Sequence, residues 1–263
     1  MARATNVILG LMAAVLAGCA PSPNGSGSLG PSGSNGSGSL GPSGSTAASQ
    51  PGPVMSPQTR LRYVALGDSY TIGTSVSIDA RWPDQLVAAL TAGGPAGGST
   101  ALDLVANLGV NGYTSRDVID AELPQVASLQ PEFITLLIGV NDVVQGVPAE
   151  TYRENVLRIL DDLVGRVGAA RIIVVTTPDY TVTPAGADYG DPTTQAAGIR
   201  ENNLILSTLA TARGITVVDI YDISLGAVTD RSLVASDGLH PSGAQYARWV
   251  ARIAPVAAGL IGP

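Results

Sequence analysis

Five apolar runs rich in β-branched residues, separated by segments with helical periodicity, constrain the fold of this chain more than any other feature. The runs are Arg62–Leu66, Leu102–Leu108, Phe133–Gly139, Arg171–Thr177 and Ile215–Tyr221. Most of them are continuous rather than alternating, which is typical of strands covered on both faces. Strands that alternate with helices form βαβ units, and such units build parallel sheets. The sequence therefore predicts an α/β fold, a three-layer α/β/α sandwich around a five-stranded parallel sheet.

The segments between these runs carry apolar residues at helical spacing. We expect helices at about Pro83–Ala92, Ser115–Ser128, Pro148–Val167, Thr193–Arg213 and Pro241–Leu260. The clearest is Pro148–Val167, where one apolar stripe comprises Val156, Ile159, Leu160, Leu163, Val164 and Val167. Ligands of such folds bind at the carboxyl ends of the strands, so the residues that follow each strand are the candidates for a site.

The first residues have the pattern of an export signal. Arg3 supplies a positive charge, the apolar run Val7–Gly18 follows, and Cys19 comes next. This run is too short to span a membrane, which takes about 20 apolar residues, but it suits a signal peptide. The sequence LAGC at Leu16–Cys19 resembles the lipobox of bacterial lipoproteins, in which the cysteine is acylated and becomes the first mature residue. The alternative is an ordinary secretory signal with an incidental cysteine.

From Ala20 to about Gln58 the composition is that of a flexible tether. The sequence NGSGSLGPSGS occurs twice in tandem, at Asn24–Ser34 and Asn35–Ser45, and no aromatic residue interrupts it. Such a segment cannot offset the entropy of ordering, so we expect disorder. We predict a lipoprotein signal peptide at 1–18, a lipidated Cys19 and linker at 19–58, and one folded domain at 59–263. The lipid would hold the domain outside the cytoplasm, on the bacterial cell membrane.

Charge and residue usage exclude several classes of function. The chain has 14 basic and 21 acidic residues, whereas nucleic-acid binding needs a basic surface. Cys19 is the only cysteine, so no disulfide forms within the chain. With one histidine and no further cysteine, only carboxylates could bind a metal, and none cluster at ligand spacing. No phosphate-binding glycine motif is present either, so we expect no cofactor. The sequence does not indicate an oligomeric state.

Polar residues and glycines follow the first three predicted strands. Ser69 follows the first strand within GDSYTIG, Gly109 and Gly112 follow the second, and Asn141 follows the third within GVND. The serine hydroxyl could attack a substrate. Backbone N–H groups at the glycines, which can approach a ligand closely, and the asparagine amide could hold a developing negative charge. Each also has an ordinary structural explanation. Ser69 could cap a helix, the two glycines could form a turn, and Asn141 could form an Asx-turn.

The stretch SDGLHPSG holds the only histidine, His240, with Asp237 three positions before it. Pro241 is of the type favoured at the first position of a helix, so we expect His240 to lie at the start of the C-terminal helix. Imidazole is the one group in the chain whose unperturbed pKa, about 6.5, suits proton abstraction near neutrality. A lone histidine is more commonly a solvated or structural residue, so the rest of the sequence must indicate whether His240 is catalytic.

These segments, in this order, resemble the SGNH subgroup of the GDSL esterase/lipase family over essentially all of Tyr63–Leu260. GDS matches the first motif, with Tyr70 in place of leucine, and Arg81–Leu86 is similar to the start of the family's next helix. The family glycine falls on Gly112, with Gly109 the other candidate. The family asparagine falls on Asn141, and its Asp-x-x-His on Asp237 and His240. The resemblance implies a flavodoxin-like hydrolase fold and a serine hydrolase that cleaves carboxylic esters through an acyl-enzyme intermediate.

In that scheme Ser69, Asp237 and His240 form the catalytic triad. Ser69, Gly112 and Asn141 form the oxyanion hole, whereas Asp68 and Asp142 brace their loops. Pro178–Gln195 is the longest non-periodic segment, and we expect it to overhang the cleft.

This segment has few large apolar side chains, which favours a short-chain or carbohydrate acyl ester as the substrate. The partner would then be a small-molecule or glycan ester. The alternative is a catalytically inactive, surface-anchored binding protein for acylated glycans.

Overall fold

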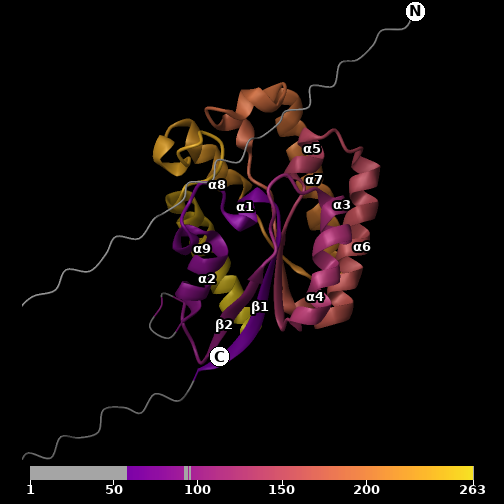
Figure 1. Ribbon diagram of the computed structural model, residues 1–263, viewed down its shortest axis with the longest axis vertical. Helices are drawn as coiled ribbons and strands as arrows, with labels where there is room; N and C mark the ends of the chain where they lie inside the picture. The colour runs from indigo at the N-terminus through magenta and orange to yellow at the C-terminus, as the bar shows by residue number, and fades with distance from the viewer. Residues whose placement is uncertain (1–57, 92–93, 95, 263) are drawn as a thin grey trace, which may run out of the picture. The chain divides into compact units, whose positions relative to one another are not determined.

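The computed structural model describes residues 58–91, 94 and 96–262, and shows the alternation of strands and helices that the sequence predicts (Figure 1). All five predicted strands are present. They are β1 (Thr59–Gly67), β2 (Thr100–Asn107), β3 (Phe133–Leu137), β4 (Ile172–Val175) and β5 (Thr216–Val218). The signal peptide, Cys19 and nearly all of the linker predicted before the domain lie outside the described residues.

The strands form one parallel sheet in the order β2-β1-β3-β4-β5. This is the flavodoxin-like order, so the predicted fold class is confirmed. The chain moves outward from β1 to β2 and then crosses back to β3, which pairs with β1 from Tyr63↔Phe133 to Gly67↔Leu137. In open sheets of this kind the ligand crevice lies at the carboxyl ends of the two strands where the direction reverses. The residues after β1 and β3 are therefore placed at the expected position of a site.

Two helices cover one face of the sheet, α2 (Trp82–Leu90) and α9 (Gly243–Ile261) (Figure 1). Trp82 and Leu86 from α2 and Trp249 from α9 are fully buried, in one apolar cluster that includes Tyr63 of β1. Their apolar stripes form the core on this side, because each helix places one such stripe on the sheet.

The opposite face is covered by α6 (Ala149–Val167), α7 (Pro192–Thr211) and a broken helical segment (Figure 1). The predicted stripe of α6 is buried from Val156 to Leu163, while Val164 and Val167 are partly buried at its edge. The sequence predicts one helix over Ser115–Ser128, but the structure has three pieces there. They are α3 (Ser115–Asp117), a π-helical turn η2 (Val118–Glu122) and α4 (Leu123–Leu129).

Short elements connect these layers. The α-helical ones are α1 (Ser69–Ile72), α5 (Val140–Val144) and α8 (Tyr221–Leu225). The 3-10 turns are η1 (Ile78–Ala80), η3 (Ala169–Arg171), η4 (Tyr180–Val182), η5 (Gly186–Tyr189), η6 (Gly226–Val228) and η7 (Arg231–Leu233).

The expectation that Pro241 begins the C-terminal helix is wrong. Helix α9 begins at Gly243, and Ser242 caps it by accepting a hydrogen bond from the N–H of Gln245. Pro241 instead forms an isolated antiparallel bridge with Val234. The bridge is reinforced where the Ala235 N–H donates to the His240 carbonyl at 2.7 Å. His240 is therefore held in a closed loop rather than on a helix.

Candidate active site

Ser69 is the first residue of α1, at a sharp turn that follows β1. The turn passes through Gly67, whose φ is +150° and where a Cβ would lie 2.2 Å from the Leu137 carbonyl oxygen. Only glycine fits such a close approach. Asp68 caps α1, because its Oδ1 accepts the Tyr70 N–H at 2.9 Å. Asp68 therefore braces this loop as predicted, and Ser69 lies at the helix N-terminus with 7% of its surface exposed.

The two glycines after β2 have different roles. The N–H of Gly109 donates to the Asn107 side chain at 3.1 Å, and a Cβ at Gly109 would lie 2.8 Å from the Asp68 carbonyl oxygen. Gly109 thus packs the loop tightly against α1. Gly112 has a φ of +82° and open space beside it, and no hydrogen bond within the described part of the chain engages its N–H. Of the two, Gly112 is the one with a backbone donor free for a ligand.

Asn141 lies on α5, directly after β3, and its amide reaches the glycine loop. Its Nδ2 donates to the Tyr113 carbonyl at 2.9 Å, and Gln145 Nε2 donates to the Gly112 carbonyl at 3.0 Å. The next residue, Asp142, is fully buried and accepts from the N–H and the hydroxyl of Ser115. These contacts join the loops that follow β2 and β3, so the structure brings Gly112 and Asn141 together and gives Asp142 the bracing position that the sequence predicts.

Asp237 and His240 meet on one loop. His240 Nδ1 lies 2.6 Å from Asp237 Oδ2, while Asp237 Oδ1 accepts the N–H groups of Leu239 and His240 at 2.9 and 3.0 Å. A carboxylate that faces Nδ1 holds the proton on that nitrogen and leaves Nε2 as the basic atom. The pair is partly buried, with 13% of the His240 side chain and 28% of the Asp237 side chain exposed.

The histidine loop lies against the helix that begins with Ser69. The rings of His240 and Tyr70, the residue after Ser69, have centroids 5.5 Å apart. The Ser75 hydroxyl, just beyond α1, donates to Asp237 Oδ2 at 2.7 Å. Residues separated by about 170 positions along the chain are therefore neighbours in the fold.

Ser75 is a site residue that the sequence does not reveal. It is a non-glycine residue with a φ of +66°, and this conformation directs its hydroxyl to Asp237. Burial alone would raise the pKa of Asp237, but hydrogen bonds from Ser75, Leu239 and His240 outweigh it and lower the pKa to about 2. Asp237 is therefore a carboxylate at any pH near neutrality.

Two buried carboxyl groups near Ser69, those of Glu122 and Asp68, have raised pKa values, in contrast to Asp237. Glu122, at the end of the π-helical turn, accepts the Gly67 N–H at 3.0 Å, and its other oxygen has no partner in the described part of the chain. Burial raises the pKa of Glu122 to about 9, and burial likewise raises the pKa of Asp68 to about 8. Charge repulsion from Asp68 and Asp117 raises the pKa of Glu122 further, and repulsion from Asp142 does the same for Asp68. Both groups are therefore protonated at neutral pH, so they support the loop without adding charge behind Ser69.

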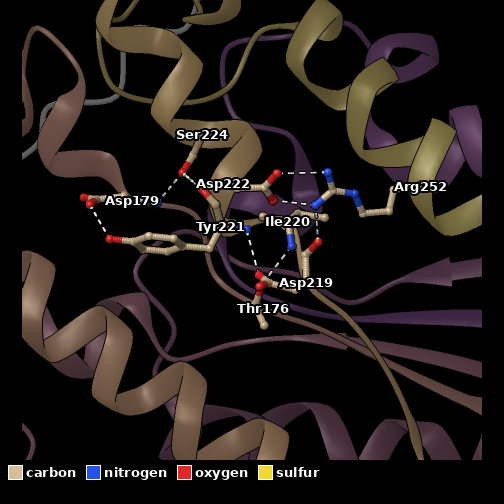
Figure 2. Close-up of polar contacts among 8 residues, drawn as sticks. All are labelled: Thr176, Asp179, Asp219, Ile220, Tyr221, Asp222, Ser224 and Arg252. Carbon is tan, nitrogen blue, oxygen red and sulfur yellow. Dashed lines mark hydrogen bonds and ion pairs between the residues drawn. The ribbon is translucent and has the colours of Figure 1, made fainter.

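The segment predicted to overhang the cleft contacts the histidine loop. It folds into η4 and η5, and its Ala185 N–H donates to the Gly238 carbonyl at 2.9 Å. Its base is fixed to the ends of β4 and β5, as Figure 2 shows. There Asp179 accepts the Tyr221 hydroxyl at 2.8 Å, and the Thr176 hydroxyl donates to Asp219 at 2.7 Å.

The described ranges hold neither a candidate metal site nor a membrane-spanning helix. No group of three or more histidine, cysteine, aspartate or glutamate side chains is placed to hold a metal ion there. Within the same residues, none of the helices combines the length and the apolar character needed to cross a bilayer.

Comparison with known families identifies the chain. Residues 65–248 match the GDSL-like lipase/acylhydrolase family, and the chain belongs to this family. It is accordingly a carboxylic ester hydrolase. No protein of curated function matches the sequence.

Solved structures show the same fold at low sequence identity. A lipase/acylhydrolase from Enterococcus faecalis is 21% identical, with a TM-score of 0.59 over 77% of this chain and 98% of that one. The acetylxylan esterase Axe2 from Geobacillus stearothermophilus is 20% identical, with a TM-score of 0.58 over 80% of this chain and 97% of that one. A structure of TesA is 17% identical, with a TM-score of 0.58 over 76% of this chain and 99% of that one.

Proposed function

We propose that the protein cleaves carboxylic esters by a serine mechanism with an acyl-enzyme intermediate. The observation that carries this proposal is the Asp237–His240 pair, 2.6 Å apart, lying against the helix that begins with Ser69. His240 Nε2 takes the proton of the Ser69 hydroxyl as its oxygen attacks the ester carbonyl. Asp237 orients the imidazole and stabilises the imidazolium that forms. The same proton then passes to the leaving alcohol, and a water molecule, activated by His240, hydrolyses the acyl-enzyme.

The negative oxygen of the tetrahedral intermediate would be held by three donors. These are the backbone N–H groups of Ser69 and Gly112 and the amide of Asn141. The free N–H of Gly112 and the position of Asn141 next to Tyr113 support this assignment. Because the loops that carry the donors are already joined by hydrogen bonds, little reorganisation is needed when the charge develops.

We propose short-chain or carbohydrate acyl esters as the substrate class. The pocket beside α1 is lined by the polar residues Thr74, Ser75 and Asn111 and by two glycines, and its aliphatic residues are Ile72 and Val110. The segment Pro178–Gln195 likewise lacks large aliphatic side chains. A long acyl chain would need an apolar channel to offset its ordering. The similarity in fold to an acetylxylan esterase is in keeping with a small acyl group on a sugar.

We also propose that the domain is tethered outside the cytoplasm through a lipid on Cys19. The support is the LAGC sequence, followed by about 40 residues rich in glycine and serine. In a bacterial host, wild type should partition into the detergent phase of a Triton X-114 extract, whereas Cys19→Ser should remain in the aqueous phase. Equal partitioning of the two proteins would contradict the lipid anchor.

Labelling by a fluorophosphonate tests the serine mechanism, because only an activated serine hydroxyl reacts with it. Wild type should be labelled at one residue, and Ser69→Ala should abolish the labelling. His240→Ala should slow it strongly, while Ser77→Ala, which changes an exposed serine in the same region, should not affect it.

Absence of labelling together with retained binding of acetylated glycans would instead favour the inactive binding protein. A protein that needs His240 but not Ser69 for ester hydrolysis would indicate a directly activated water.

A further inference from the structure

A pocket adjoins the helix that carries Ser69. Its volume is about 550 Å³, and it opens between the turn after α1 and the loop after β2. The lining residues are Ile72, Gly73, Thr74, Ser75, Arg81, Gly109, Val110 and Asn111. Gly73 lies one helical turn beyond Ser69 and donates its N–H to the Ser69 carbonyl at 3.0 Å. Ser75 contacts Asp237 from the same turn. The pocket is therefore lined by residues that themselves contact Ser69 and Asp237.

Arg81 brings a positive charge to this pocket. Its stem crosses the backbone of Gly73, where an added Cβ would lie 2.4 Å from Arg81 Cγ. Gly73 has a φ of +72°, so glycine is required there both by the backbone conformation and by the arginine stem. The packing holds the stem in place, which lowers the entropy lost when the guanidinium binds a ligand.

The guanidinium of Arg81 has no internal counter-ion. Its Nε is buried without a hydrogen-bond partner, and no ion pair or side-chain hydrogen bond of Arg81 occurs in the described residues. Burial raises the pKa of Asp84 and the charge of Arg81 lowers it, but the two side chains form no ion pair in the described residues. Six other arginines in the described ranges pair with carboxylates: Arg116, Arg153, Arg166, Arg213, Arg248 and Arg252. Four more donate hydrogen bonds to other oxygens, namely Arg62, Arg171, Arg200 and Arg231, while Arg60 and Arg158 are exposed. A partly buried cation that is left unpaired in an acidic protein fits an anionic ligand.

A second donor lies in the same pocket. The Thr74 hydroxyl donates to Asn111 Oδ1 at 2.5 Å, which fixes the amide and leaves Asn111 Nδ2 without a partner among the described residues. One guanidinium and one amide match a planar anion of single charge, because the arginine fork donates two parallel hydrogen bonds to a carboxylate.

We propose that this pocket binds a carboxylate of the substrate, and that Arg81 determines the preference for a carboxylate ester over a neutral one. The proposal rests on the ester hydrolysis proposed above and narrows the substrate to an ester whose acyl or alcohol part carries a carboxylate, such as an acylated sugar acid.

Two matched pairs of esters test it with the full chain. For the acyl side, p-nitrophenyl hydrogen succinate is compared with methyl p-nitrophenyl succinate. For the alcohol side, p-acetoxybenzoate is compared with its methyl ester. Within a pair the carboxylate is either free or methylated. After subtraction of spontaneous hydrolysis, the change in the ratio of the two kcat/KM values between wild type and variant reports recognition of the carboxylate, because the intrinsic reactivities of the esters cancel. The neutral ester reports hydrolysis itself.

The decisive variant is Arg81→Met, which keeps an apolar stem over Gly73 and removes the charge. We expect wild type to prefer the carboxylate ester in at least one pair. In Arg81→Met the preference in that pair should fall about 10- to 100-fold, the usual effect of losing a hydrogen bond to a charged group. Arg81→Lys, which keeps the charge but loses the fork, should be intermediate, and it carries the test if the methionine variant does not fold. Arg60→Met, at the opposite end of β1, makes the same change in net charge and should leave both ratios unchanged.

The outcomes separate this proposal from the hydrolase mechanism. Neutral esters that are hydrolysed with no preference for the carboxylate in either pair would overturn the pocket's role and leave the mechanism intact. An equal loss of preference in Arg60→Met would attribute the effect to net charge and would also overturn it. If no ester were hydrolysed and Ser69 were not labelled by fluorophosphonate, the mechanism would fail, and this proposal with it.

Discussion

Replacing Glu122 by glutamine should change how stability depends on pH. Glu122 is fully buried, accepts the Gly67 N–H and has one oxygen without a partner in the described part of the chain. Glutamine has the same shape and keeps an oxygen to accept the Gly67 N–H, but it cannot ionise. The substitution therefore removes the titration while preserving the contact.

The sign and size of the effect follow from the two pKa values. Burial raises the pKa of Glu122 from 4.5 to about 9, so between these values the unfolded chain has released a proton that the folded protein keeps. The contribution of Glu122 to stability is therefore fully present below pH 4.5 and declines as the pH rises towards 9. At about 1.4 kcal/mol per pH unit, the decline between pH 5 and pH 8 is about 4 kcal/mol.

Urea unfolding of wild type and Glu122→Gln at pH 5 and at pH 8 measures this difference. The free energy of unfolding should fall with pH more steeply in wild type, by up to about 4 kcal/mol, so that the variant gains relative stability at pH 8. Asp68 titrates in both proteins, so its own contribution largely cancels from the comparison. Parallel pH profiles for the two proteins would refute the assignment of a protonated Glu122.

Three further predictions concern the loops around Ser69. Asn141→Ala should lower kcat for a p-nitrophenyl ester by about a hundred- to a thousandfold while the far-UV circular dichroism is retained, and unchanged turnover would remove Asn141 from the site. Gly109→Ala should lower the free energy of unfolding by about 1–3 kcal/mol, because the new Cβ would lie 2.8 Å from two backbone atoms, and an unchanged denaturant midpoint would contradict that packing. Asp237, with its pKa lowered to about 2, should contribute stability that is fully present above pH 3.8 and lost as the pH falls through 2. Ser75→Ala should raise the pKa of Asp237 in an NMR titration. An unchanged pKa would show that the Ser75 hydrogen bond does not lower it.

The layers of the fold were predictable because they depend on patterns of many residues. Continuous β-branched runs mark buried parallel strands, and the stripe of Pro148–Val167 marks a helix on the sheet. All five runs became strands, with ends that differ from prediction by a few residues. The association of Asp237 with His240 was predictable for a related reason, because a spacing of three places both on one loop.

Features that depend on single tertiary contacts were not predictable. Pro241 is of the type that favours a helix start, yet it forms a bridge with Val234. Ser242 caps the helix instead, so α9 begins at Gly243. The break in Ser115–Ser128 is a π-helical turn that ends at Glu122, whose carboxyl reaches the strand turn at Gly67. The role of Ser75 requires a positive φ that serine seldom adopts, and no local pattern signals it. Glu122 and Ser75 depend on partners far away in the sequence, Gly67 and Asp237, whereas Pro241 depends on its bridge to Val234 and on the cap at Ser242.

The position of Asp237 and His240 on one short loop affects how the protein tolerates motion. In triads assembled from separate segments, any loosening disturbs the acid–base contact and the contact with the nucleophile together. Here the imidazole and its carboxylate are joined within three residues and closed by the bridge between Val234 and Pro241. Under the triad proposed above, any movement of this loop relative to α1 would carry the imidazole and the carboxylate together, so the tautomer that leaves Nε2 basic would be kept.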